Sequence, residues 1–402
     1  MSMAEHAVIV GTGAAGVAVA ESLRTEGFTG KVTLVGDETS LPYDRPPLSK
    51  QVLSGAWDMD RVRLRSADHF AKQGIRLRLG KAAQNLDTQQ RRVRLTDGET
   101  LDYDHLVIAT GVLPRLLPFG HDLLGVHVLR SEFDLAAMQD TLARSKKLVV
   151  IGAGFLGAEV ASVLVENYDV TLVDPLPSPM IRQVGPAVGT LVAELHRARG
   201  VNLITGTGVE TIAGHQGRVS GVGLGDGRML SADLVLVAIG AVPATDWLRT
   251  SGLILDDGVV CDAYCRAAPD VYAAGDVASW PNFRYHGQRM RLEHRLNATE
   301  QGAAVARNIV ADTPTPFTPI PYFWSDQFGI RLQAYGVFPP RADIEFADGN
   351  PGDDRFVVLY SVDGKLVGAL GWNHPKATMK YRKVLAESWT PDAVPVGSGE
   401  AL

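Results

Sequence analysis

The stretch Gly11-Thr12-Gly13-Ala14-Ala15-Gly16 is the feature that decides the fold of the first part of the chain. An apolar run at residues 7–10 precedes it and predicts a buried strand, a helix is predicted over residues 17–24, and a second strand over residues 31–35. A strand, a G-x-G-x-x-G turn, a helix and a strand in this order are typical of a dinucleotide-binding unit. The first glycine permits the tight turn, the second lets a pyrophosphate approach the backbone, and the third allows close strand–helix packing. The free N–H groups at the helix N-terminus then face the phosphates.

The same pattern returns in the middle of the chain, as Gly152-Ala153-Gly154-Phe155-Leu156-Gly157. A strand is predicted before it at residues 148–151, a helix after it at residues 158–166, and a further strand at residues 170–173. One glycine-rich turn alone is weak evidence, because such turns are common. Two turns with the correct flanks predict two dinucleotide sites, and their distance along the chain places each in its own domain.

Each unit has an acidic residue at the end of its second strand. We assign Asp37 to the ribose hydroxyls of the first dinucleotide, with an ordinary loop acid as the alternative. Asp174 directly follows the strand at residues 170–173. A carboxylate there favours a free 2′-hydroxyl and repels a 2′-phosphate. No arginine follows at once, so the sequence favours NADH over NADPH as the second dinucleotide.

The order of the apolar runs predicts that the second dinucleotide-binding domain is inserted into the first. Residues 106–109 run into Thr110-Gly111, and residues 234–239 run into Gly240, so each looks like a strand at a domain crossing. A stiff, proline-dense linker follows later, and beyond it strand-like runs and a helix near residues 377–386 predict a smaller domain. The expected class is α/β, with two Rossmann-like domains and a C-terminal α/β domain. The expected boundaries are 1–110 and 240–318 for the first domain, 111–239 for the second and 319–402 for the third.

Composition and charge narrow the class of protein. The net charge of −6 makes nucleic acid a poor candidate for the main partner. No apolar run approaches the roughly 20 residues that cross a bilayer, and the N-terminus lacks the basic start of a signal peptide. We therefore expect a cytoplasmic protein that does not enter a membrane, and a monomer or weak dimer. The only cysteines, Cys261 and Cys265, lack zinc spacing and partners, so we expect neither a disulfide framework nor a metal site.

The chain resembles the NADH-dependent ferredoxin reductases of bacterial oxygenase systems, which are two-dinucleotide flavoproteins with a glutathione-reductase-like fold. Besides the glycine loops, the matching motifs cover nearly the whole chain: Pro42-Tyr43-Asp44-Arg45-Pro46-Pro47-Leu48-Ser49-Lys50, Ala109-Thr110-Gly111, Ala273-Ala274-Gly275-Asp276-Val277, Arg291-Leu292-Glu293 and Phe323-Trp324-Ser325-Asp326-Gln327. The R-P-P-L-S-K and F-W-S-D-Q stretches are specific to this branch. The resemblance implies FAD at the first loop and NADH at the second, with electrons leaving to a [2Fe–2S] ferredoxin that serves a cytochrome P450 or a Rieske oxygenase.

The resemblance also implies the reacting residues. Lys50 is expected beside the flavin N5, paired with Glu159, because a buried lysine needs a partner and a cation there would stabilise negative charge on reduced flavin. A solvated surface lysine is the alternative for Lys50. Phe155 is expected to cover the nicotinamide pocket until NADH displaces it, with core packing as the alternative.

Further residues are implied to contact one of the two dinucleotides. Asp276 is expected to reach the ribityl chain, Arg130 to contact FAD from the NAD segment, and Ala83 to offer backbone hydrogen bonds to adenine. The implied FAD-binding set is Gly11, Gly13, Ala14, Ala15, Gly16, Asp37, Arg45, Lys50, Ala83, Ala109, Thr110, Gly111, Arg130, Gly275, Asp276, Glu293, His294 and Arg295. The implied NAD-binding set is Gly152, Gly154, Phe155, Leu156, Gly157, Glu159, Asp174 and Gly240.

Three features concern the path of the electrons. Disulfide reductases of this architecture carry a cysteine pair near residues 42–50, whereas this chain has no cysteine before Cys261, so electrons are expected to leave the flavin directly. Arg295 stands where this branch often has an aromatic residue, and we hypothesise that it stabilises the reduced anion at the flavin N1–C2 edge; a surface arginine is the alternative. Trp324 is the candidate electron exit, with an interdomain core tryptophan as the alternative.

A basic docking face is expected for an acidic ferredoxin. Two groups of arginines cluster in sequence and are candidates for it, although alternating arginines also suit a solvated strand edge: Arg61, Arg63 and Arg65, and Arg284, Arg289, Arg291 and Arg295. Two other functions stay open. A rubredoxin reductase shares the glycine loops, and an NADH-sensing flavoprotein similar to apoptosis-inducing factor would turn over slowly.

Overall fold

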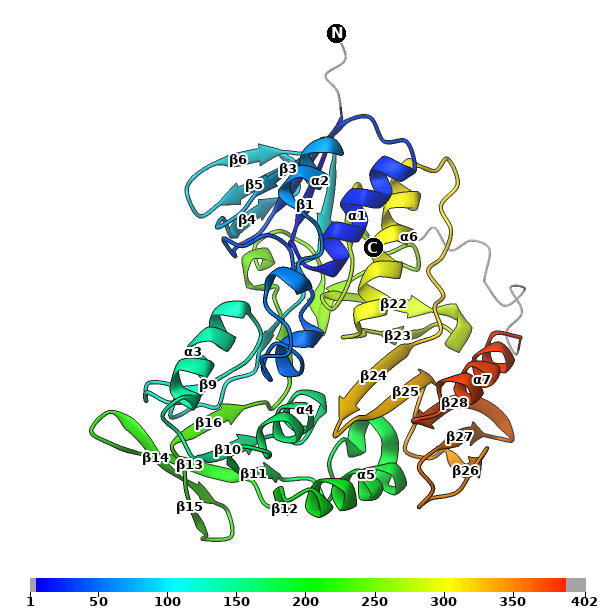
Figure 1. Ribbon diagram of the computed structural model, residues 1–402. Coiled ribbons are helices and arrows are strands. Elements are labelled where there is room, and N and C mark those ends of the chain that lie inside the picture. Colours follow the sequence, from blue (N-terminus) through cyan, green and yellow to red (C-terminus); the bar gives the residue numbers. More distant parts are fainter. Residues whose placement is uncertain (1–4, 388–402) are drawn as a thin grey trace.

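A computed structural model describes residues 5–387 of the protein (Figure 1). The start of the chain at residues 1–4, where the absence of a signal peptide was expected, lies outside the described residues. So does the end of the expected third domain, residues 388–402.

A parallel sheet forms the centre of the first domain. Its strands lie in the order β20-β21-β7-β1-β2-β3, and β21, β7, β1, β2 and β3 run parallel to one another. The bounds are β1 (His6–Val10), β2 (Lys31–Val35), β3 (Ile75–Arg78), β7 (His105–Ile108), β20 (Arg266–Ala268) and β21 (Val271–Ala273). Buried, mostly apolar residues occupy both faces of β1, β2, β7 and β21, as is typical of a parallel sheet covered on both sides.

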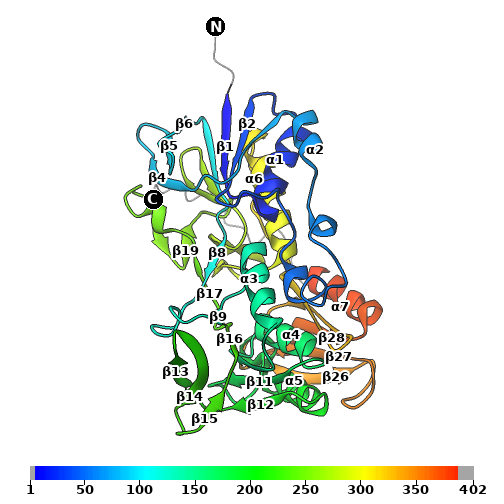
Figure 2. The same ribbon diagram turned by 60° about the vertical axis from the view of Figure 1, so that its left-hand side comes forward.

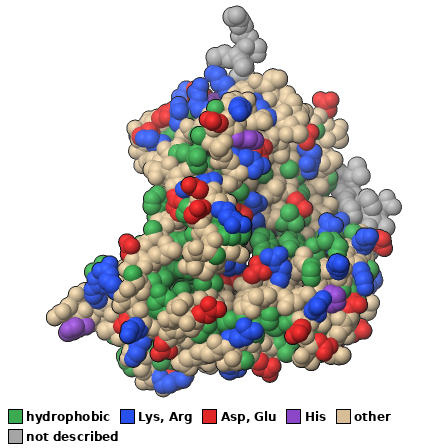
Figure 3. Space-filling view, viewed as in Figure 1, with side chains coloured by type: hydrophobic (Ala, Val, Ile, Leu, Met, Phe, Trp, Pro, Cys, Tyr) green, Lys and Arg blue, Asp and Glu red, His purple; other side chains and the backbone are tan. Residues whose placement is uncertain are grey.

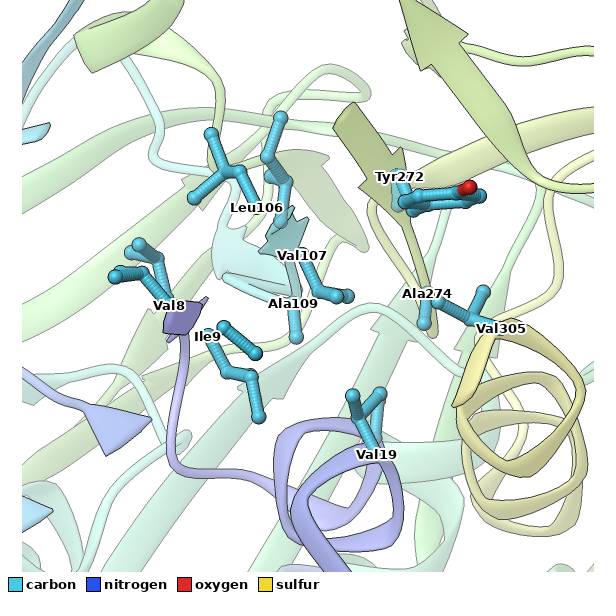
Figure 4. Packing of buried hydrophobic residues seen from close by; sticks show 14 of the residues in the cluster. Val8, Ile9, Val19, Leu106, Val107, Ala109, Tyr272, Ala274 and Val305 are labelled. Atoms are coloured by element: carbon cyan, nitrogen blue, oxygen red, sulfur yellow. The ribbon is translucent and has the colours of Figure 1, made fainter. Parts of the chain in front are cut away.

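Two helices pack together against this sheet, α1 (Ala14–Thr25) and α6 (Arg295–Val310). Figure 4 shows the packing, with Val19 of α1 and Val305 of α6 facing Ile9, Val107 and Ala274. Helix α1 lies at the start of the chain, whereas α6 follows the second domain in sequence. The two parts of the first domain therefore share one hydrophobic core.

Smaller elements complete the first domain. They are η1 (Pro46–Ser49), η2 (Asp60–Val62), α2 (Ala67–Lys72), β4 (Ala83–Asp87), β5 (Arg92–Leu95), β6 (Thr100–Asp102), η3 (Asp246–Leu248), β18 (Leu255–Asp256), β19 (Gly258–Val260), β22 (Ala278–Asn282), η4 (Phe283–Tyr285) and β23 (Gln288–Met290).

The second domain has its own parallel sheet, in the order β12-β11-β10-β16-β9. Its strands are β9 (Val126–His127), β10 (Lys147–Ile151), β11 (Asp169–Asp174), β12 (Asn202–Thr205) and β16 (Leu234–Val237). Its helices are α3 (Glu132–Leu142), α4 (Phe155–Leu164) and α5 (Ile181–Ala198), and β13 (Val209–His215), β14 (Arg218–Leu224) and β15 (Met229–Ser231) form a side sheet.

The second domain is inserted into the first, as the sequence predicted. The chain passes between them along β8 (Val112–Pro114) and returns along β17 (Ala241–Pro243), which pair antiparallel (Figure 2). Helices α1 and α4 begin inside their glycine loops, earlier than predicted, because Gly13 and Gly154 are themselves the N-caps.

As far as residue 387, the third domain consists of a five-stranded antiparallel sheet and one helix. The sheet order is β24-β25-β28-β27-β26, and α7 (Pro375–Glu387) packs on β28 and β25. The strands are β24 (Tyr322–Gln327), β25 (Ile330–Gly336), β26 (Asp343–Ala347), β27 (Phe356–Val362) and β28 (Lys365–Trp372).

The proline-dense segment before β24 is tied to the first domain. The N–H of Phe317 donates to the carbonyl of Ala263, the indole of Trp280 donates to the carbonyl of Phe317 at 3.1 Å, and Asn282 holds the carbonyl of Pro319. The segment therefore fixes where the third domain begins. Among the described residues, no helix is long and apolar enough to cross a membrane.

Candidate functional site

One cavity of about 810 Å³ opens where the three domains meet. This volume is within the range of small-molecule and cofactor sites. Figure 3 shows apolar side chains gathering where the upper and lower domains meet. The predicted residues on the cavity wall are Gly11, Gly13, Ala14, Ala15, Asp37, Arg45, Lys50, Ala83, Ala109, Thr110, Gly111, Arg130, Gly152, Gly154, Phe155, Leu156, Glu159, Asp174, Gly240, Gly275, Asp276, Glu293, His294, Arg295 and Trp324. Only Gly16 and Gly157 of the predicted set do not line it.

The first glycine loop has no room for side chains at two of its positions. A Cβ on Gly11, whose φ is +122°, would lie 2.0 Å from the carbonyl oxygen of Ala109, and one on Gly16 would lie 1.8 Å from that of Gly11. A Cβ on Gly13, by contrast, would meet nothing within 4 Å, because this position borders the cavity. Gly16 therefore serves packing rather than ligand contact, and Gly13 leaves the cavity open beside the backbone.

The second loop repeats these constraints. A Cβ on Gly152, whose φ is +101°, would lie 2.4 Å from the carbonyl oxygen of Ala238, and one on Gly157 would lie 1.8 Å from that of Gly152. Near Gly154 the only close atom is the amide nitrogen of Gln183, at 3.8 Å. Neither α1 nor α4 has a side-chain cap or an acidic residue in its first turn, so both helix N-termini keep N–H groups for an anion. Both loops therefore fit a dinucleotide pyrophosphate.

The two acids differ in how they are held. The exposed Asp37 accepts a hydrogen bond from the N–H of Glu38, at 3.1 Å. The half-buried Asp174 accepts from the N–H of Ala153, inside the second loop, at 2.7 Å and from that of Leu176 at 2.8 Å. The carboxylate of Asp174 is thus fixed by the backbone of its own site.

Lys50 and Glu159 form a buried ion pair at 2.6 Å between the first and second domains. Their side chains are 10% and 6% exposed, so the alternative of a solvated surface lysine is wrong. The Glu159 carboxylate also accepts hydrogen bonds from Ser49 at 2.6 Å and from Ser325 of the third domain at 2.9 Å. Sequence reasoning missed both serines, although each lies in a branch-specific motif quoted above.

Arg130 reaches the cavity from the start of the second domain. Its guanidinium lies 3.3 Å from the carboxylate of Asp276, while Arg45 donates to its backbone carbonyl at 2.6 Å. Burial, together with the neighbouring Arg45 guanidinium, lowers the pKa of Arg130. A half-buried cation whose hydrogen-bonded carboxylate partner lies on the same cavity wall suits a site that receives an anionic ligand.

Arg45 is itself held by two residues that the sequence did not indicate. Glu38 forms an ion pair with it at 2.6 Å, and the hydroxyl of Tyr43 donates to Glu38. Glu38, which follows Asp37 in sequence, therefore holds the Arg45 guanidinium in place.

The start of α6 contributes three predicted residues to the cavity wall. Glu293 pairs with Arg291 at 2.7 Å, and the His294 ring lies 5.5 Å from that of Phe323. Burial lowers the pKa of His294 to about 4, so this imidazole is neutral at physiological pH. Arg295 pairs with Asp44 and is 26% exposed, which places it on the cavity wall rather than fully in solvent.

Two aromatic side chains of the cavity wall lie beside or within the third domain. Phe155 follows the second glycine of its loop, and its ring meets that of Phe323 at 5.0 Å. Trp324 is half-buried on the cavity wall and stacks on Tyr322, with ring centroids 6.0 Å apart. Trp324 is therefore not enclosed in an interdomain core.

The arginines that the sequence suggested for a docking face all have partners within the protein, although Arg61, Arg65 and Arg289 stay exposed. Arg289 donates to the backbone carbonyls of Cys261 and Ser279, and Arg291 pairs with Asp257 and Glu293. The remaining side chains are engaged likewise: Arg63 with Glu132, Arg65 with Glu21, Arg61 over Trp57, Arg284 with the carbonyl of Thr318, and Arg295 with Asp44. Each of these arginines therefore contributes to contacts within the protein.

Comparison with known proteins places these features in a family. A family described as pyridine nucleotide-disulphide oxidoreductase matches residues 5–302, and a reductase C-terminal family matches residues 322–398. Rhodocoxin reductase of Rhodococcus erythropolis is 38% identical over 94% of this chain and 89% of its own length. Putidaredoxin reductase of Pseudomonas putida is 37% identical over 96% and 93%. The chain belongs to the pyridine nucleotide-disulphide oxidoreductases, in the branch of ferredoxin reductases of oxygenase systems.

Solved structures of this branch share the fold. The reductase of the covalent putidaredoxin reductase–putidaredoxin complex matches with a TM-score of 0.91 and 34% identity, over 95% of this chain and 93% of that one. A ferredoxin reductase from Rhodopseudomonas palustris matches with a TM-score of 0.91 and 32% identity, over 95% of each chain. The resemblance inferred from the motifs is confirmed. The disulphide of the family's name has no counterpart here, since Cys261 and Cys265 are buried, free thiols outside the cavity wall.

Proposed function

We propose that this ferredoxin reductase takes hydride from NADH through FAD and delivers single electrons to a [2Fe–2S] ferredoxin serving a cytochrome P450 or a Rieske oxygenase. The observation that carries the proposal is the single cavity that holds both glycine loops, with the Lys50–Glu159 ion pair between the first two domains and Trp324 on the side of the third. We also propose that the protein works in the cytoplasm as a monomer or weak dimer.

The first loop would hold FAD and the second NADH. When bound, FAD supplies the chemistry that converts a two-electron hydride into single electrons. Gly13 leaves room for the pyrophosphate of FAD, and Arg130 with Asp276 would bind the chain that leads to the flavin. Lys50, paired with Glu159, would place a positive charge in the part of the cavity where the flavin accepts negative charge.

The NADH site would differ from the FAD site in two respects. It would discriminate against NADPH, and a side chain would cover it until the nicotinamide binds. Asp174, fixed by the N–H groups of Ala153 and Leu176, presents a negative charge that disfavours a 2′-phosphate. Phe155 covers the cavity from the first turn of α4 and contacts Phe323 of the third domain. A bound nicotinamide would have to displace this ring.

The third domain offers a basic docking face that differs from the arginine clusters considered above. Helix α7 exposes four cations, Lys376, Lys380, Arg382 and Lys383. Blue side chains gather in Figure 3 at the right-hand edge, where Figure 1 places α7. Arg382 lies 5.9 Å from the ring of Tyr335, which packs on Tyr322 at 4.7 Å, and Tyr322 stacks on Trp324. We propose that an acidic ferredoxin docks on α7 and receives electrons past Trp324.

One assay separates this function from its alternatives. The purified holoprotein is mixed with NADH, cytochrome c and either a [2Fe–2S] ferredoxin or a rubredoxin. Fast reduction of cytochrome c that depends on the ferredoxin supports the proposal, and preference for rubredoxin supports the rubredoxin reductase. Slow turnover with a long-lived, long-wavelength absorption band with either carrier supports the NADH-sensing flavoprotein and contradicts the proposal.

The docking face has a matched test. Replacing Lys376 and Lys383 with glutamate should lower the rate of ferredoxin reduction about 10-fold or more at low salt and weaken its salt dependence. The same charge change at the exposed Lys31 and Lys72 of the first domain should leave the rate unchanged. Equal losses in both variants would contradict a specific face on α7.

A further inference from the structure

Strand β24 carries two chemically different faces. The half-buried Trp324 lies on the cavity wall, whereas its neighbour Ser325 is completely buried and Gln327 is 2% exposed. Side chains alternate along a strand, so Ser325 and Gln327 share the face opposite Trp324. The proposed electron exit uses only the tryptophan and leaves these two buried polar residues of the branch-specific motif unexplained.

Ser325 and Gln327 belong to a chain of hydrogen bonds that ends on Glu159. The hydroxyl of Ser325 donates to Glu159 at 2.9 Å, and the amide of Gln327 donates to the Ser325 hydroxyl at 3.0 Å. The amide oxygen of Gln327 lies 2.8 Å from Nε2 of His196. An amide oxygen can only accept, so Nε2 carries the proton and each donor in the chain points toward the carboxylate. Such aligned donors strengthen one another.

This series of hydrogen bonds joins all three domains at the Lys50–Glu159 pair. His196 lies on α5 of the second domain, Ser325 and Gln327 on β24 of the third, and Lys50 follows η1 of the first. His196 is fully buried and burial lowers its pKa, so it is a neutral donor at physiological pH. The third domain therefore supplies one of the hydrogen-bond donors to the buried Glu159 carboxylate.

We infer that Ser325, held by Gln327 and His196, is a positioning residue that holds the Glu159 carboxylate in its ion pair with Lys50. The inference rests on the proposed function, because it gives the third domain a part in accepting hydride as well as in passing electrons out. Both faces of one strand would then serve the reaction, Ser325 through Glu159 and Trp324 through the docked ferredoxin.

Few other charged groups can account for the state of Glu159. The elements packed on α4 are η1, β24, β10 and β11. Besides Lys50, they carry four charged residues. Asp326 pairs with Arg331, and Asp174 is bound by the N–H of Ala153. Lys147 and Asp169 lie at the ends of their strands that are far from the glycine loop. Arg295 of α6 shares the cavity wall but pairs with Asp44.

The test compares two buried hydroxyls beside one glutamate. Ser325→Ala removes a donor to the Glu159 carboxylate, whereas Ser162→Ala removes a buried hydroxyl that donates to the backbone carbonyl of Glu159 at 2.7 Å. In the holoenzyme, the infrared band of a protonated carboxyl group is followed against pH and assigned to Glu159 by its absence in Glu159→Gln. Reduction of the flavin by NADH is measured separately in a stopped-flow experiment.

We expect Ser325→Ala to strengthen the infrared band of protonated Glu159 at a given pH, because the carboxylate loses a hydrogen-bond donor that favours its charged form. We expect flavin reduction to slow about 10-fold, an effect that disappears in a Glu159→Gln background. Ser162→Ala should change neither quantity. Gln327→Met, nearly isosteric, should strengthen the band by less, and it serves as the test where Ser325→Ala does not fold.

An unchanged infrared band in both Ser325→Ala and Gln327→Met would overturn the inference, whatever the activity. A slower flavin reduction that persists in the Glu159→Gln background would also overturn it, because Ser325 would then act independently of Glu159. A strengthened band with unchanged reduction would support the positioning of Glu159 while contradicting the proposed role of Lys50 in accepting hydride.

Discussion

The two glycine loops have nearly the same backbone and different surroundings. Gly13 and Gly154 are both N-caps, with φ −73° and −74° and ψ −172° and −164°, and each borders open space. Around the first loop lie Arg130 and Arg45, anchored across domains. Around the second lies Asp174. We propose that each loop accepts a dinucleotide and that the neighbouring charges determine which dinucleotide binds and how tightly.

The largest expected effect lies where the two sites meet. Lys50→Met should slow flavin reduction by NADH about 100-fold and lower the free energy of unfolding by about 3 kcal/mol, because Glu159 is left buried without its cation. Stopped-flow reduction and denaturant unfolding measure the two quantities. In the double variant with Glu159→Leu, stability should return while the rate should not. Recovery of both would show that the ion pair is only structural.

The next largest effect concerns FAD binding beside the first loop. Arg130→Leu should weaken FAD binding about 50-fold, as expected for one charge-assisted contact worth about 2–3 kcal/mol. The affinity of the reconstituted holoenzyme for NADH should stay the same. Titration of apoprotein with FAD, followed by flavin fluorescence, measures the first quantity. A parallel loss of NADH affinity would contradict the separation of the two sites.

A smaller, pH-dependent effect concerns the wall of the first site. The pKa of His294 is about 4 in the folded protein, below its ordinary value, so between about pH 6.5 and 4 the unfolded chain binds the extra proton. Stability from His294 is therefore complete above pH 6.5 and falls as the pH drops, by about 2 kcal/mol at pH 5. His294→Gln should reduce the loss of unfolding free energy between pH 7.5 and pH 5. An unchanged loss would count against the buried neutral state.

The smallest effect should appear at the second loop. Asp174→Asn should narrow the preference for NADH over NADPH about 10-fold, because the negative charge that opposes a 2′-phosphate is removed while an acceptor for Ala153 remains. Asp37→Asn is the matched control at the first loop and should leave this preference unchanged. Steady-state kinetics with both nucleotides gives the comparison.

The fold was largely predictable because its determinants are local. Two G-x-G-x-x-G turns between apolar strands and helices define two Rossmann-like domains. The runs ending at Gly111 and Gly240 predicted the insertion.

The parts of the site that depend on long-range contacts were not predictable. Nothing near Ser325 in the sequence says that its hydroxyl reaches Glu159, which lies on another domain. Nothing in the sequence indicates that Arg289, a candidate docking cation, also donates to two backbone carbonyls. Composition and spacing identify which residues carry charge, whereas their partners follow only from the packing of the three domains.

The most direct test of the account compares Gly13→Ala with Gly154→Ala. Both positions have φ and ψ that alanine adopts, and a Cβ at either one would project toward the cavity without meeting backbone, so the fold should tolerate both changes. The measurement is flavin content after gel filtration, followed by reduction of the retained flavin with NADH and with dithionite. The account predicts that Gly13→Ala loses most of its flavin, and that Gly154→Ala keeps its flavin, is reduced by dithionite, and responds poorly to NADH. Loss of flavin from both variants, or from Gly154→Ala alone, would contradict the assignment of FAD to the first loop and NADH to the second.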